Sequence, residues 1–465
     1  MSAHRAAPIA ASLPLIGHPS ELAVLAYRGG RPIAAGRFLH EVRRLAALMP
    51  PGRHVLNVCG DRYRFAVGLC AALYSGRISL LPSTQTPEVI RRLREFASDA
   101  FCLYDDEVCE IDLPRLRYPT DLRGAAGPWD VPMIEAGRIA AYVFTSGSTG
   151  TPIPHAKTWG RLRRCVDGEA QRLGIDAMNP PVIVGTVPPQ HMYGFETTVL
   201  MALQSGAAFC AERPFYPADI GAALAGVPRP RILVTTPVHL RALLQSEVAM
   251  PAADLLVCAT AHLSESLARQ AEASFQAPLL EIYGSTETGQ IATRRTAQEV
   301  RWRLWPQVRL EADDAQTFAA GGHLEARTPL NDRVELLDEE HFLLHGRGSD
   351  MVNIAGKRSS FGYLDHQLCA IEGVRDGAFF LREEDGSAVG VSRLGALVVA
   401  PGLDAAAVLR GLRERIDAVF LPRPLLFVER LPRNGTGKLP RQSLLQLARS
   451  LAPGATPPDQ RQDPP

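Results

Sequence analysis

The sequence predicts an α/β protein with largely parallel sheets, followed by a smaller α+β segment over residues 351–450. Short apolar runs alternate with stretches of helical periodicity as far as residue 282. Strands that are apolar along their whole length are buried on both faces, as they are in parallel sheets covered by helices. After about residue 320 the pattern changes to in-and-out alternation, which is typical of hairpins.

The individual elements follow from these patterns. Phe38, Val42 and Leu45 recur at helical spacing, and Leu48 continues the series, so an amphipathic helix is expected there. Helices are predicted at residues 34–49, 65–74 and 404–419. Strands are predicted at residues 54–59, 78–82, 140–144, 182–187, 207–210, 232–235, 255–258, 279–282, 323–327, 342–345 and 396–399. The proline-rich residues 451–465 are expected to be a disordered tail.

The bulk composition is that of an ordinary globular protein. The 465 residues are 46% hydrophobic and 21% charged, and this length predicts roughly two to four domains. The formal net charge of +1 gives no overall field that would attract nucleic acid or an anionic membrane. No apolar run approaches the ~20 residues that span a bilayer, and prolines interrupt any signal-peptide-like run. We therefore expect a soluble, cytoplasmic protein with no nucleic-acid partner and no membrane span.

The eight cysteines show no metal or redox motif. They lie at positions 59, 70, 102, 109, 165, 210, 258 and 369, and no pair has CxxC spacing. A structural zinc site and a thioredoxin-like motif are therefore not indicated. Buried, reduced thiols are the expectation.

The strongest local feature is a loop rich in glycine and hydroxyl residues. The apolar strand at residues 140–144 runs directly into Thr145-Ser146-Gly147-Ser148-Thr149-Gly150. Glycine permits conformations that turn backbone N–H groups inward, and hydroxyl groups add donors, so such a loop can wrap a polyphosphate. It is not a Walker A loop, because no Gly-Lys-Ser/Thr follows. Taken alone, the segment is equally well explained as a solvated connector.

The residue order of this loop resembles the signature of the adenylate-forming superfamily, which includes acyl- and aryl-CoA ligases, luciferases and peptide-synthetase adenylation domains. The family pattern is Thr-Ser-Gly-Ser/Thr-Thr-Gly-x-Pro-Lys, and this chain matches it as far as Pro152. Ile153 stands where the family has lysine, and Lys157 is a candidate to supply the missing charge.

A second segment, Tyr283-Gly284-Ser285-Thr286-Glu287, matches the family's Tyr-Gly-x-Thr-Glu motif. The resemblance implies that Tyr283 and Gly284 lie at the adenine and that the Thr286 hydroxyl bonds the α-phosphate. Glu287 is implied as the magnesium ligand, and one carboxylate is enough because Mg²⁺ takes its other ligands from phosphate and water.

Two further segments resemble those that border the family's acyl pocket. His191 lies in a Pro-x-x-His-x-x-Gly segment, and Ala259, Thr260 and Ala261 lie where relatives have Gly-Gly-Ala. The Thr260 side chain is expected to narrow the pocket. Without the family context, His191 is more often a structural histidine, and residues 259–261 read equally well as an ordinary strand-to-helix turn.

The ribose and hinge positions are assigned by spacing and resemblance. Asp332 and Arg347 stand at the spacing at which the family binds the ribose hydroxyls. Ser349 or Asp350 occupies the place of the hinge about which the family's small domain rotates. The remaining positions are implied at the thiol tunnel or near the acceptor, and they are Asn353, Gly356 and Arg358.

Near the C-terminus, Pro432 to Lys438 resembles the family's Pro-x-x-x-x-Gly-Lys motif. The resemblance implies that the Lys438 ammonium bridges the substrate carboxylate and the α-phosphate, where it offsets charge that builds in the transition state. A Gly-Lys pair in a turn is otherwise an ordinary surface feature.

Together, these matches imply an N-terminal domain over residues 1–347, made of two doubly wound subdomains and a small β-barrel element. A small, mobile α+β domain would cover residues 348–450. The implied reaction uses ATP and Mg²⁺ to activate a carboxylic acid as acyl-AMP. A phosphopantetheine thiol, from CoA or an acyl carrier protein, then takes the acyl group. The resemblance extends to small ligases of aryl-polyene and xanthomonadin-type clusters, which suggests a hydroxybenzoate- or cinnamate-like acid. A medium-chain fatty acyl-CoA ligase and a non-catalytic nucleotide-binding homologue are the alternatives.

Overall fold

The computed structural model describes residues 11–82, 84–122, 129–146, 152–175, 178–261, 263–313, 316–347, 351–354, 357–382, 393–434 and 437–451. The chain divides into two compact units. The larger unit comprises Met1–Ala259, Leu267–Pro329 and Leu336–Phe342. The smaller unit comprises Thr260–Ser266, Leu330–Glu335 and Leu343–Pro465.

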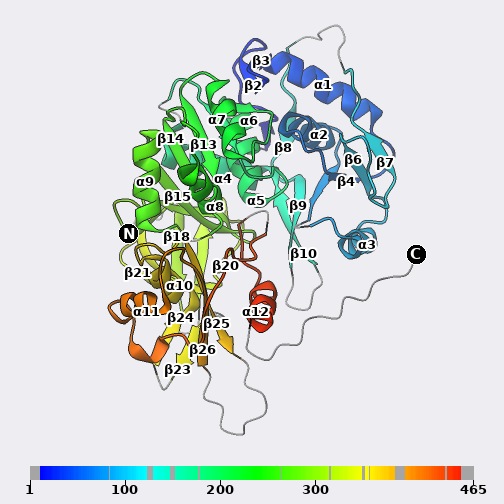
Figure 1. The fold of residues 1–465 in the computed structure, drawn as a ribbon. Coiled ribbons are helices and arrows are strands. Elements are labelled where there is room, and N and C mark those ends of the chain that lie inside the picture. The colour runs from blue at the N-terminus through cyan, green and yellow to red at the C-terminus, as the bar shows by residue number, and fades with distance from the viewer. Residues whose placement is uncertain are drawn as a thin grey trace, which may run out of the picture. The chain divides into compact units, whose positions relative to one another are not determined.

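The first sheet of the larger unit has six strands in the order β10-β9-β5-β4-β6-β7 (Figure 1). The strands are β4 (His54–Asn57), β5 (Ile78–Leu81), β6 (Phe101–Tyr104), β7 (Arg115–Arg117), β9 (Ile139–Ser146) and β10 (Pro152–Thr158). All neighbours are parallel except β9 and β10, which form an antiparallel pair. Helix α1 (Ala35–Leu48) precedes β4, while α2 (Arg62–Tyr74) connects β4 to β5 and α3 (Pro87–Phe96) connects β5 to β6.

Helix α1 shows how the sequence pattern translates into packing. Phe38, Val42 and Leu45 are fully buried, as their helical spacing predicts, because they share the face that packs on the core. Leu48, at the end of the helix, is 51% exposed and therefore lies outside that face.

The second sheet of the larger unit runs β22-β17-β16-β15-β14-β13-β11-β12-β2-β3. Its strands are β2 (Val24–Arg28), β3 (Arg31–Ala34), β11 (Val182–Gly185), β12 (Ala208–Cys210), β13 (Arg231–Thr235), β14 (Leu255–Cys258), β15 (Leu279–Ser285), β16 (Gly289–Arg294), β17 (Trp302–Leu304) and β22 (His341–Arg347). The central strands from β12 to β15 are parallel, and β11 and β14 are buried at every residue. The predicted parallel, doubly covered sheets are thus confirmed.

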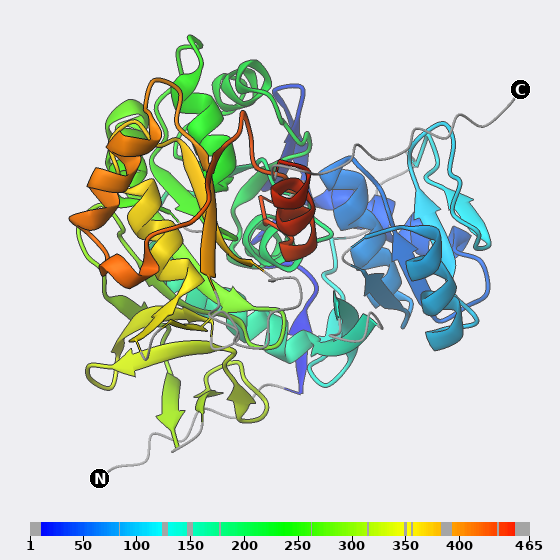
Figure 2. The same ribbon diagram turned by 60° about the horizontal axis from the view of Figure 1, so that its bottom comes forward.

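Helices flank this second sheet in both views of the ribbon (Figures 1 and 2). They are α4 (Trp159–Leu173), α5 (Met192–Gly194), the π-helical turn η2 (Phe195–Leu200), α6 (Met201–Ser205), α7 (Pro217–Ala225), α8 (Pro237–Gln245) and α9 (Glu265–Phe275). A short two-stranded sheet pairs β1 (Ser12–Pro14) with β8 (Met133–Glu135).

The small β element is an open antiparallel sheet of β18 (Val308–Ala312), β19 (Thr317–Gly321) and β20 (Thr328–Pro329). Among the residues described, it does not close into a barrel. The predicted strand at 323–327 is wrong, because the chain turns there between β19 and β20. His323 and Leu324 are both buried in this turn and residues 325–327 are exposed, so burial does not alternate as it would in a strand.

Arg62, the first residue of α2, joins that helix to two strand ends of the second sheet. Its guanidinium is fully buried and donates to the carbonyls of Gly185 and Val187 at 2.8 and 3.1 Å. It also donates to Cys210 and Glu212 at 2.9 and 2.7 Å. Burial lowers the pKa of Arg62 to about 10, so the side chain remains charged at neutral pH.

Replacing Arg62 with methionine is expected to lower the free energy of unfolding by about 3 kcal/mol, because three buried carbonyls and one partly buried carbonyl lose a charged donor. Urea unfolding followed by tryptophan fluorescence measures this change. The exposed Arg31, replaced in the same way, serves as the control and should leave the midpoint unchanged. Equal midpoints for the two variants would contradict the structural role of Arg62.

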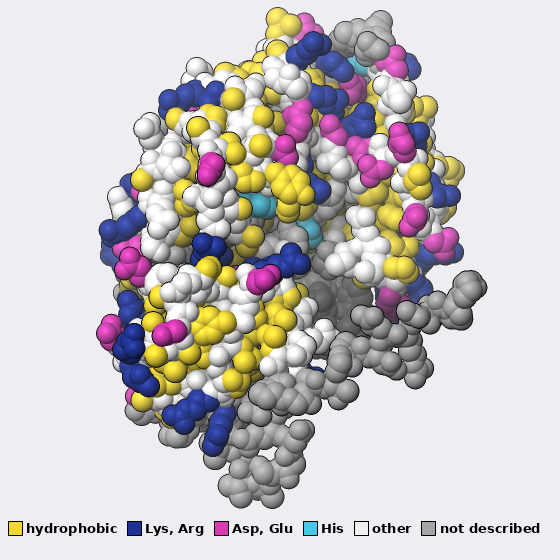
Figure 3. Space-filling view, viewed as in Figure 1, with side chains coloured by type: hydrophobic (Ala, Val, Ile, Leu, Met, Phe, Trp, Pro, Cys, Tyr) yellow, Lys and Arg dark blue, Asp and Glu magenta, His cyan; other side chains and the backbone are white. Residues whose placement is uncertain are grey.

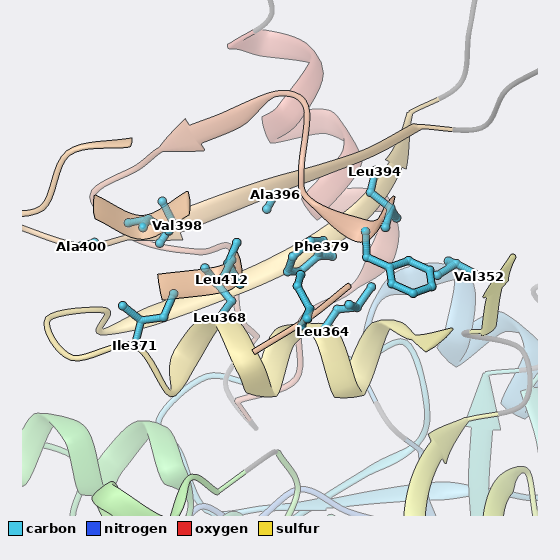
Figure 4. Packing of buried hydrophobic residues seen from close by; sticks show 13 residues of the cluster. Val352, Leu364, Leu368, Ile371, Phe379, Leu394, Ala396, Val398, Ala400 and Leu412 are labelled. Carbon is cyan, nitrogen blue, oxygen red and sulfur yellow. The ribbon is translucent and has the colours of Figure 1, made fainter. Parts of the chain in front are cut away.

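The smaller unit is built on a sheet of β25 (Asp376–Arg382), β26 (Arg393–Val399) and β27 (Leu425–Phe427). Its other elements are β21 (Asp332–Leu336), the hairpin β23 (Met351–Ile354) and β24 (Lys357–Ser360), helices α10 (Phe361–Cys369), α11 (Ala405–Arg413) and α12 (Arg441–Ser450), and a 3₁₀ turn at Ala418–Phe420. Figure 4 shows Leu364 and Leu368 of α10 packed against Phe379 of β25, with Leu412 beside them.

The helix predicted at 404–419 is shorter than expected. It ends at Arg413, and a separate 3₁₀ turn follows, which the Asp417 side chain caps by accepting from the Val419 N–H. A local cap of this kind offers the backbone an alternative to a continued helix.

The surface and thiols agree with the composition. On the face shown in Figure 3, Lys and Arg side chains are interspersed with Asp and Glu. Seven of the eight cysteines are buried, Cys369 is partly exposed, and none forms a disulfide within the described residues. No helix in the described part of the chain has the length and apolar character that a membrane crossing requires.

Candidate functional site

The phosphate-loop segment connects two antiparallel strands of the first sheet. Thr145 and Ser146 end β9, and Pro152 begins β10, with Ser146 opposite Pro152 in the ladder. Gly147, Ser148, Thr149 and Gly150 lie outside the described residues. The predicted strand that leads into this segment is therefore present. Ile153, at the position of the family's lysine, is 50% exposed.

The Tyr-Gly-x-Thr-Glu segment forms the tight turn between β15 and β16. Ser285 pairs with Gly289, and the side chains of Ser285 and Thr288 cap one another's backbone N–H groups at 3.2 and 3.1 Å. Gly284 is required for close approach, because a Cβ there would lie 2.3 Å from the Gly289 carbonyl oxygen. Close packing against Gly289 thus explains why the motif has glycine at position 284. Its predicted place at the nucleotide stays a prediction.

The structure brings these two segments together at His155, a residue of β10 that the sequence did not single out. The His155 Nε2 atom lies 2.9 Å from the Thr145 hydroxyl and 4.0 Å from Oε1 of Glu287. The end of β9 and the turn between β15 and β16, which we call the acidic turn because it carries Glu287, therefore both lie close to the His155 imidazole. The only sequence signal for the place of His155 is the two-residue period of a strand, which puts His155 on the same face of β10 as Ile153 and Lys157.

The Glu287 carboxylate is held in its charged form. Burial alone would raise the pKa of Glu287, but hydrogen bonds from its own backbone N–H and from Ser285, with the charges of His155 and Lys157, lower it. Burial lowers the pKa of His155. An ionised, partly exposed carboxylate beside hydroxyl groups suits Mg²⁺, a hard cation that prefers oxygen ligands. Glu287 and neighbouring hydroxyls would hold it there.

Lys157, the candidate to supply the charge missing at Ile153, contacts the backbone of the turn that carries Glu287. Its side chain is fully buried and its ammonium donates to the Thr286 carbonyl, under the turn. Burial, and then the nearby Arg161, lower the pKa of Lys157 to about 8, while Glu196 opposes the shift.

Tyr283 lies in an aromatic cluster at the base of the same turn. Its ring centroid is 5.6 Å from that of Trp302 and 5.7 Å from that of Phe342. The cluster fixes the orientation of the ring, and the expected stacking on adenine stays a prediction.

The segment predicted to border the acyl pocket is firmly attached to the second sheet. Half-buried His191 precedes the single turn α5, and the Tyr193 hydroxyl donates to the carbonyls of Thr235 and Val257 at 3.2 and 3.0 Å. Ala259 follows the end of β14 and is buried. The segment continues into the π-helical turn η2, and such turns recur at functional sites.

Thr260 adopts a left-handed backbone conformation with φ +80°. A β-branched residue is strained there, at about 1–3 kcal/mol, whereas glycine is not. The glycine at this position in the superfamily is thereby explained. Strain of this kind is retained where function demands it, so Thr260 and the half-buried Ala261 stay predicted pocket residues.

In the smaller unit, several predicted residues fall at strand ends. Asp332 begins β21 and is half-buried, and Arg347 ends β22, whose residues from Leu343 onward belong to the smaller unit. Asn353 and Arg358 face each other in the β23–β24 hairpin. Three predicted positions lie outside the described residues, namely Ser349, Asp350 and Gly356.

Lys438 is exposed on a turn that two residues hold in place. Gly437, with φ +79°, donates to the Asn434 carbonyl, and the Lys438 N–H donates to the Asn434 side chain at 2.9 Å. Arg433 donates to the Gly437 carbonyl at 3.0 Å and forms a bidentate pair with Asp376 at 2.8 Å. Arg433 therefore attaches the turn to the first residue of β25.

The two mainly parallel sheets have the fold of an adenylate-forming enzyme, and Thr145 at the end of β9 and Glu287 of the β15–β16 turn both lie close to His155. A family model described as AMP-binding enzyme matches residues 18–342, which is more than half of the chain. The chain belongs to the AMP-binding enzyme family.

Curated relatives agree with this membership. The chain is 30% identical over 298 residues to a 4-coumarate–CoA ligase of Rhodobacter capsulatus, which covers 63% of this chain and 73% of the relative. A 4-coumarate–CoA ligase of Halorhodospira halophila is also 30% identical, over 305 residues, with the same coverage. The chain is an AMP-forming acid–thiol ligase that uses ATP to activate an acid.

Solved structures share the fold at low sequence identity. ATP-bound MatB from Rhodopseudomonas palustris has a TM-score of 0.77 at 18% identity, covering 92% of this chain and 96% of that one. The o-succinylbenzoate CoA synthetase of Bacillus subtilis, in complex with ATP and a magnesium ion, has a TM-score of 0.75 at 16% identity, covering 91% and 96%.

Proposed function

We propose that this enzyme activates an aryl carboxylic acid of the hydroxybenzoate or cinnamate type and passes it to a phosphopantetheine thiol. The observation that carries the activation step is the meeting of Thr145, His155 and Glu287. It brings the phosphate-loop strand and the carboxylate suited to Mg²⁺ to one place. The 4-coumarate–CoA ligases among the relatives support an aryl acid with a hydroxyl group.

In the first half-reaction, an oxygen of the substrate carboxylate attacks the α-phosphorus of ATP. A P–O bond forms, the bond to the bridging oxygen breaks, and pyrophosphate leaves with the bonding electron pair. Hydroxyl and N–H groups from Thr145 to Gly150 would hold the phosphates, and Thr286 would donate to the α-phosphate. Mg²⁺, when bound at Glu287, would neutralise phosphate charge. Lys438 would stabilise the charge that develops between carboxylate and phosphate.

In the second half-reaction, the thiol attacks the acyl carbonyl carbon of the adenylate and AMP leaves, so a thioester forms and the thiol proton is released. Rotation of the small domain about Ser349 or Asp350 would withdraw Lys438 before this step. Asn353, Gly356 and Arg358 would then line the path of the pantetheine arm. The acceptor is CoA or a carrier protein.

Arg433 is expected to act through the Lys438 turn. Replacing it with methionine removes the bond to Gly437 and the pair with Asp376, so the backbone that carries Lys438 loses its attachment to β25. We expect roughly 10–100-fold slower adenylate formation, because small misplacements of a reacting group carry such effects. Thioester formation from supplied adenylate should be unaffected. Rapid-quench assays of the two half-reactions separate these outcomes, and an unchanged first half-reaction would refute this role.

The substrate and acceptor are tested together. ATP–pyrophosphate exchange is measured with hydroxycinnamates, hydroxybenzoates and medium-chain fatty acids, and the products formed with CoA and with a holo carrier protein are weighed by mass spectrometry. We expect the aryl acids to support the fastest exchange and to appear as thioesters. Faster exchange with fatty acids would replace the aryl assignment. Exchange without any thioester would refute the transfer step.

A further inference from the structure

Three consecutive carbonyls of the acidic turn are each bound by a basic side chain from another element. The Thr286 carbonyl accepts from the Lys157 ammonium, which also lies 3.5 Å from the Glu287 carbonyl oxygen. The Glu287 carbonyl accepts from the Arg161 guanidinium. The Thr288 carbonyl accepts from the His323 imidazole at 2.9 Å. We call Lys157, Arg161 and His323 the basic clamp.

The clamp reaches the turn from three separate parts of the larger unit. Lys157 comes from β10, Arg161 from the first turn of α4, and His323 from the turn between β19 and β20. Lys157 and His323 are buried, with exposures of 0% and 2%. Burial lowers the pKa of His323 to about 3, so the ring is neutral and its Nε2–H can donate to the carbonyl.

The acidic turn is also closely packed on its buried side. A Cβ on Gly289 would lie 3.1 Å from a Glu196 carboxylate oxygen and 3.3 Å from the His323 Nε2 atom. Glu196 is itself buried in η2 and accepts from the Cys165 thiol at 3.1 Å. The turn is therefore fixed on one side by hydrogen bonds and close packing, while the Glu287 side chain keeps 29% of its surface exposed.

We propose that the basic clamp positions Glu287 for the metal by holding the backbone carbonyls of residues 286–288. This inference rests on the proposed role of Glu287 as the Mg²⁺ ligand. Residues that orient a metal ligand through hydrogen bonds set metal affinity, even though they do not touch the metal. Lys157 and Arg161 are then positioning residues. This role also accounts for Lys157, which stands four residues after Ile153, the position at which the family has its loop lysine.

The test compares Lys157→Met and Arg161→Met with the wild-type enzyme. Two properties are measured without turnover: hydrogen exchange of the peptide spanning Leu279–Arg294, and the Mg²⁺ concentration that gives half of the thermal stabilisation by ATP. We expect faster exchange in the turn and a roughly 10–100-fold higher Mg²⁺ midpoint. Arg172→Met is the matched control, because Arg172 lies on the same helix α4 and donates to a carbonyl outside the turn, that of Leu304, at 2.9 Å.

A clamp variant that folds and binds ATP with the wild-type Mg²⁺ midpoint would overturn the inference. So would an equal rise of the midpoint in Arg172→Met, because any loss of a buried cation would then have the same effect. If Lys157→Met does not fold, Arg161→Met decides, since its side chain is less buried. The outcomes are separable from the proposed function: a raised midpoint without acid-dependent pyrophosphate exchange supports the clamp and refutes acid activation.

Discussion

Replacing Lys438 with alanine is expected to slow acid-dependent pyrophosphate release by roughly 10²–10³-fold, the size of effect seen when one group that stabilises transition-state charge is removed. Lys438 is an exposed residue, and its backbone N–H donates to the Asn434 side chain in the turn that ends at Gly437. Rapid-quench measurement of pyrophosphate release gives the rate directly.

The loss in Lys438→Ala should be confined to the first half-reaction. Acyl-AMP supplied to the variant should still be converted to thioester, because Lys438 has no role after pyrophosphate leaves. Exposed Arg430, replaced by alanine, is the control, since it removes the same charge from the same part of the chain. Both proteins should unfold within about 0.5 kcal/mol of the wild type, as surface substitutions do. Undiminished release in Lys438→Ala would refute the catalytic role.

Replacing Glu287 with glutamine is expected to have the second-largest effect. The amide keeps the size and shape of the side chain and leaves the backbone bonds of Thr286 to Thr288 in place. It removes the negative charge that the turn holds in its ionised form. We expect roughly 10²-fold slower exchange at fixed Mg²⁺, partly restored by raising the Mg²⁺ concentration, because metal binding and not the fold is impaired.

The control for Glu287→Gln is Glu340→Gln, an exposed carboxylate of the same unit that pairs with Arg303 at 3.0 Å. It should leave both the rate and the Mg²⁺ dependence unchanged. If Glu287→Gln kept the wild-type Mg²⁺ dependence, the metal would have to bind elsewhere.

The elements predicted best from the sequence are those with local, periodic signals. Helix α1 and the buried parallel strands β11 and β14 follow directly from the spacing and density of apolar residues. The turn at 323–327 resembles a strand in sequence because apolar Leu324 and Ala326 alternate with polar residues. In the structure burial does not follow this alternation, since His323 and Leu324 are both buried and residues 325–327 are exposed. The expected helix at 404–419 is longer than α11 because periodicity alone does not reveal that the helix ends at Arg413 and that Asp417 begins a separate 3₁₀ turn.

The site residues, too, are predictable where they form a contiguous motif and not where their contacts are distant in sequence. Thr286 and Glu287 were found because their motif is contiguous, and the structure adds the packing reason for Gly284. Lys157, Arg161 and His155 were not assigned to the turn, because their contacts join residues that are far apart in sequence: Lys157 lies 129 residues from Thr286. Such pairings depend on how the β9–β10 hairpin is placed against the second sheet, which no local pattern encodes.

The central claim is that this chain activates a carboxylic acid with ATP, and acid-dependent ATP–pyrophosphate exchange tests it most directly. The wild-type enzyme is assayed with Mg²⁺, ATP, labelled pyrophosphate and each acid of the panel. We predict exchange that requires both Mg²⁺ and the acid, with hydroxycinnamates and hydroxybenzoates among the best substrates. No exchange with any acid by a protein that still binds ATP would contradict the claim and identify the fold as a nucleotide-binding module.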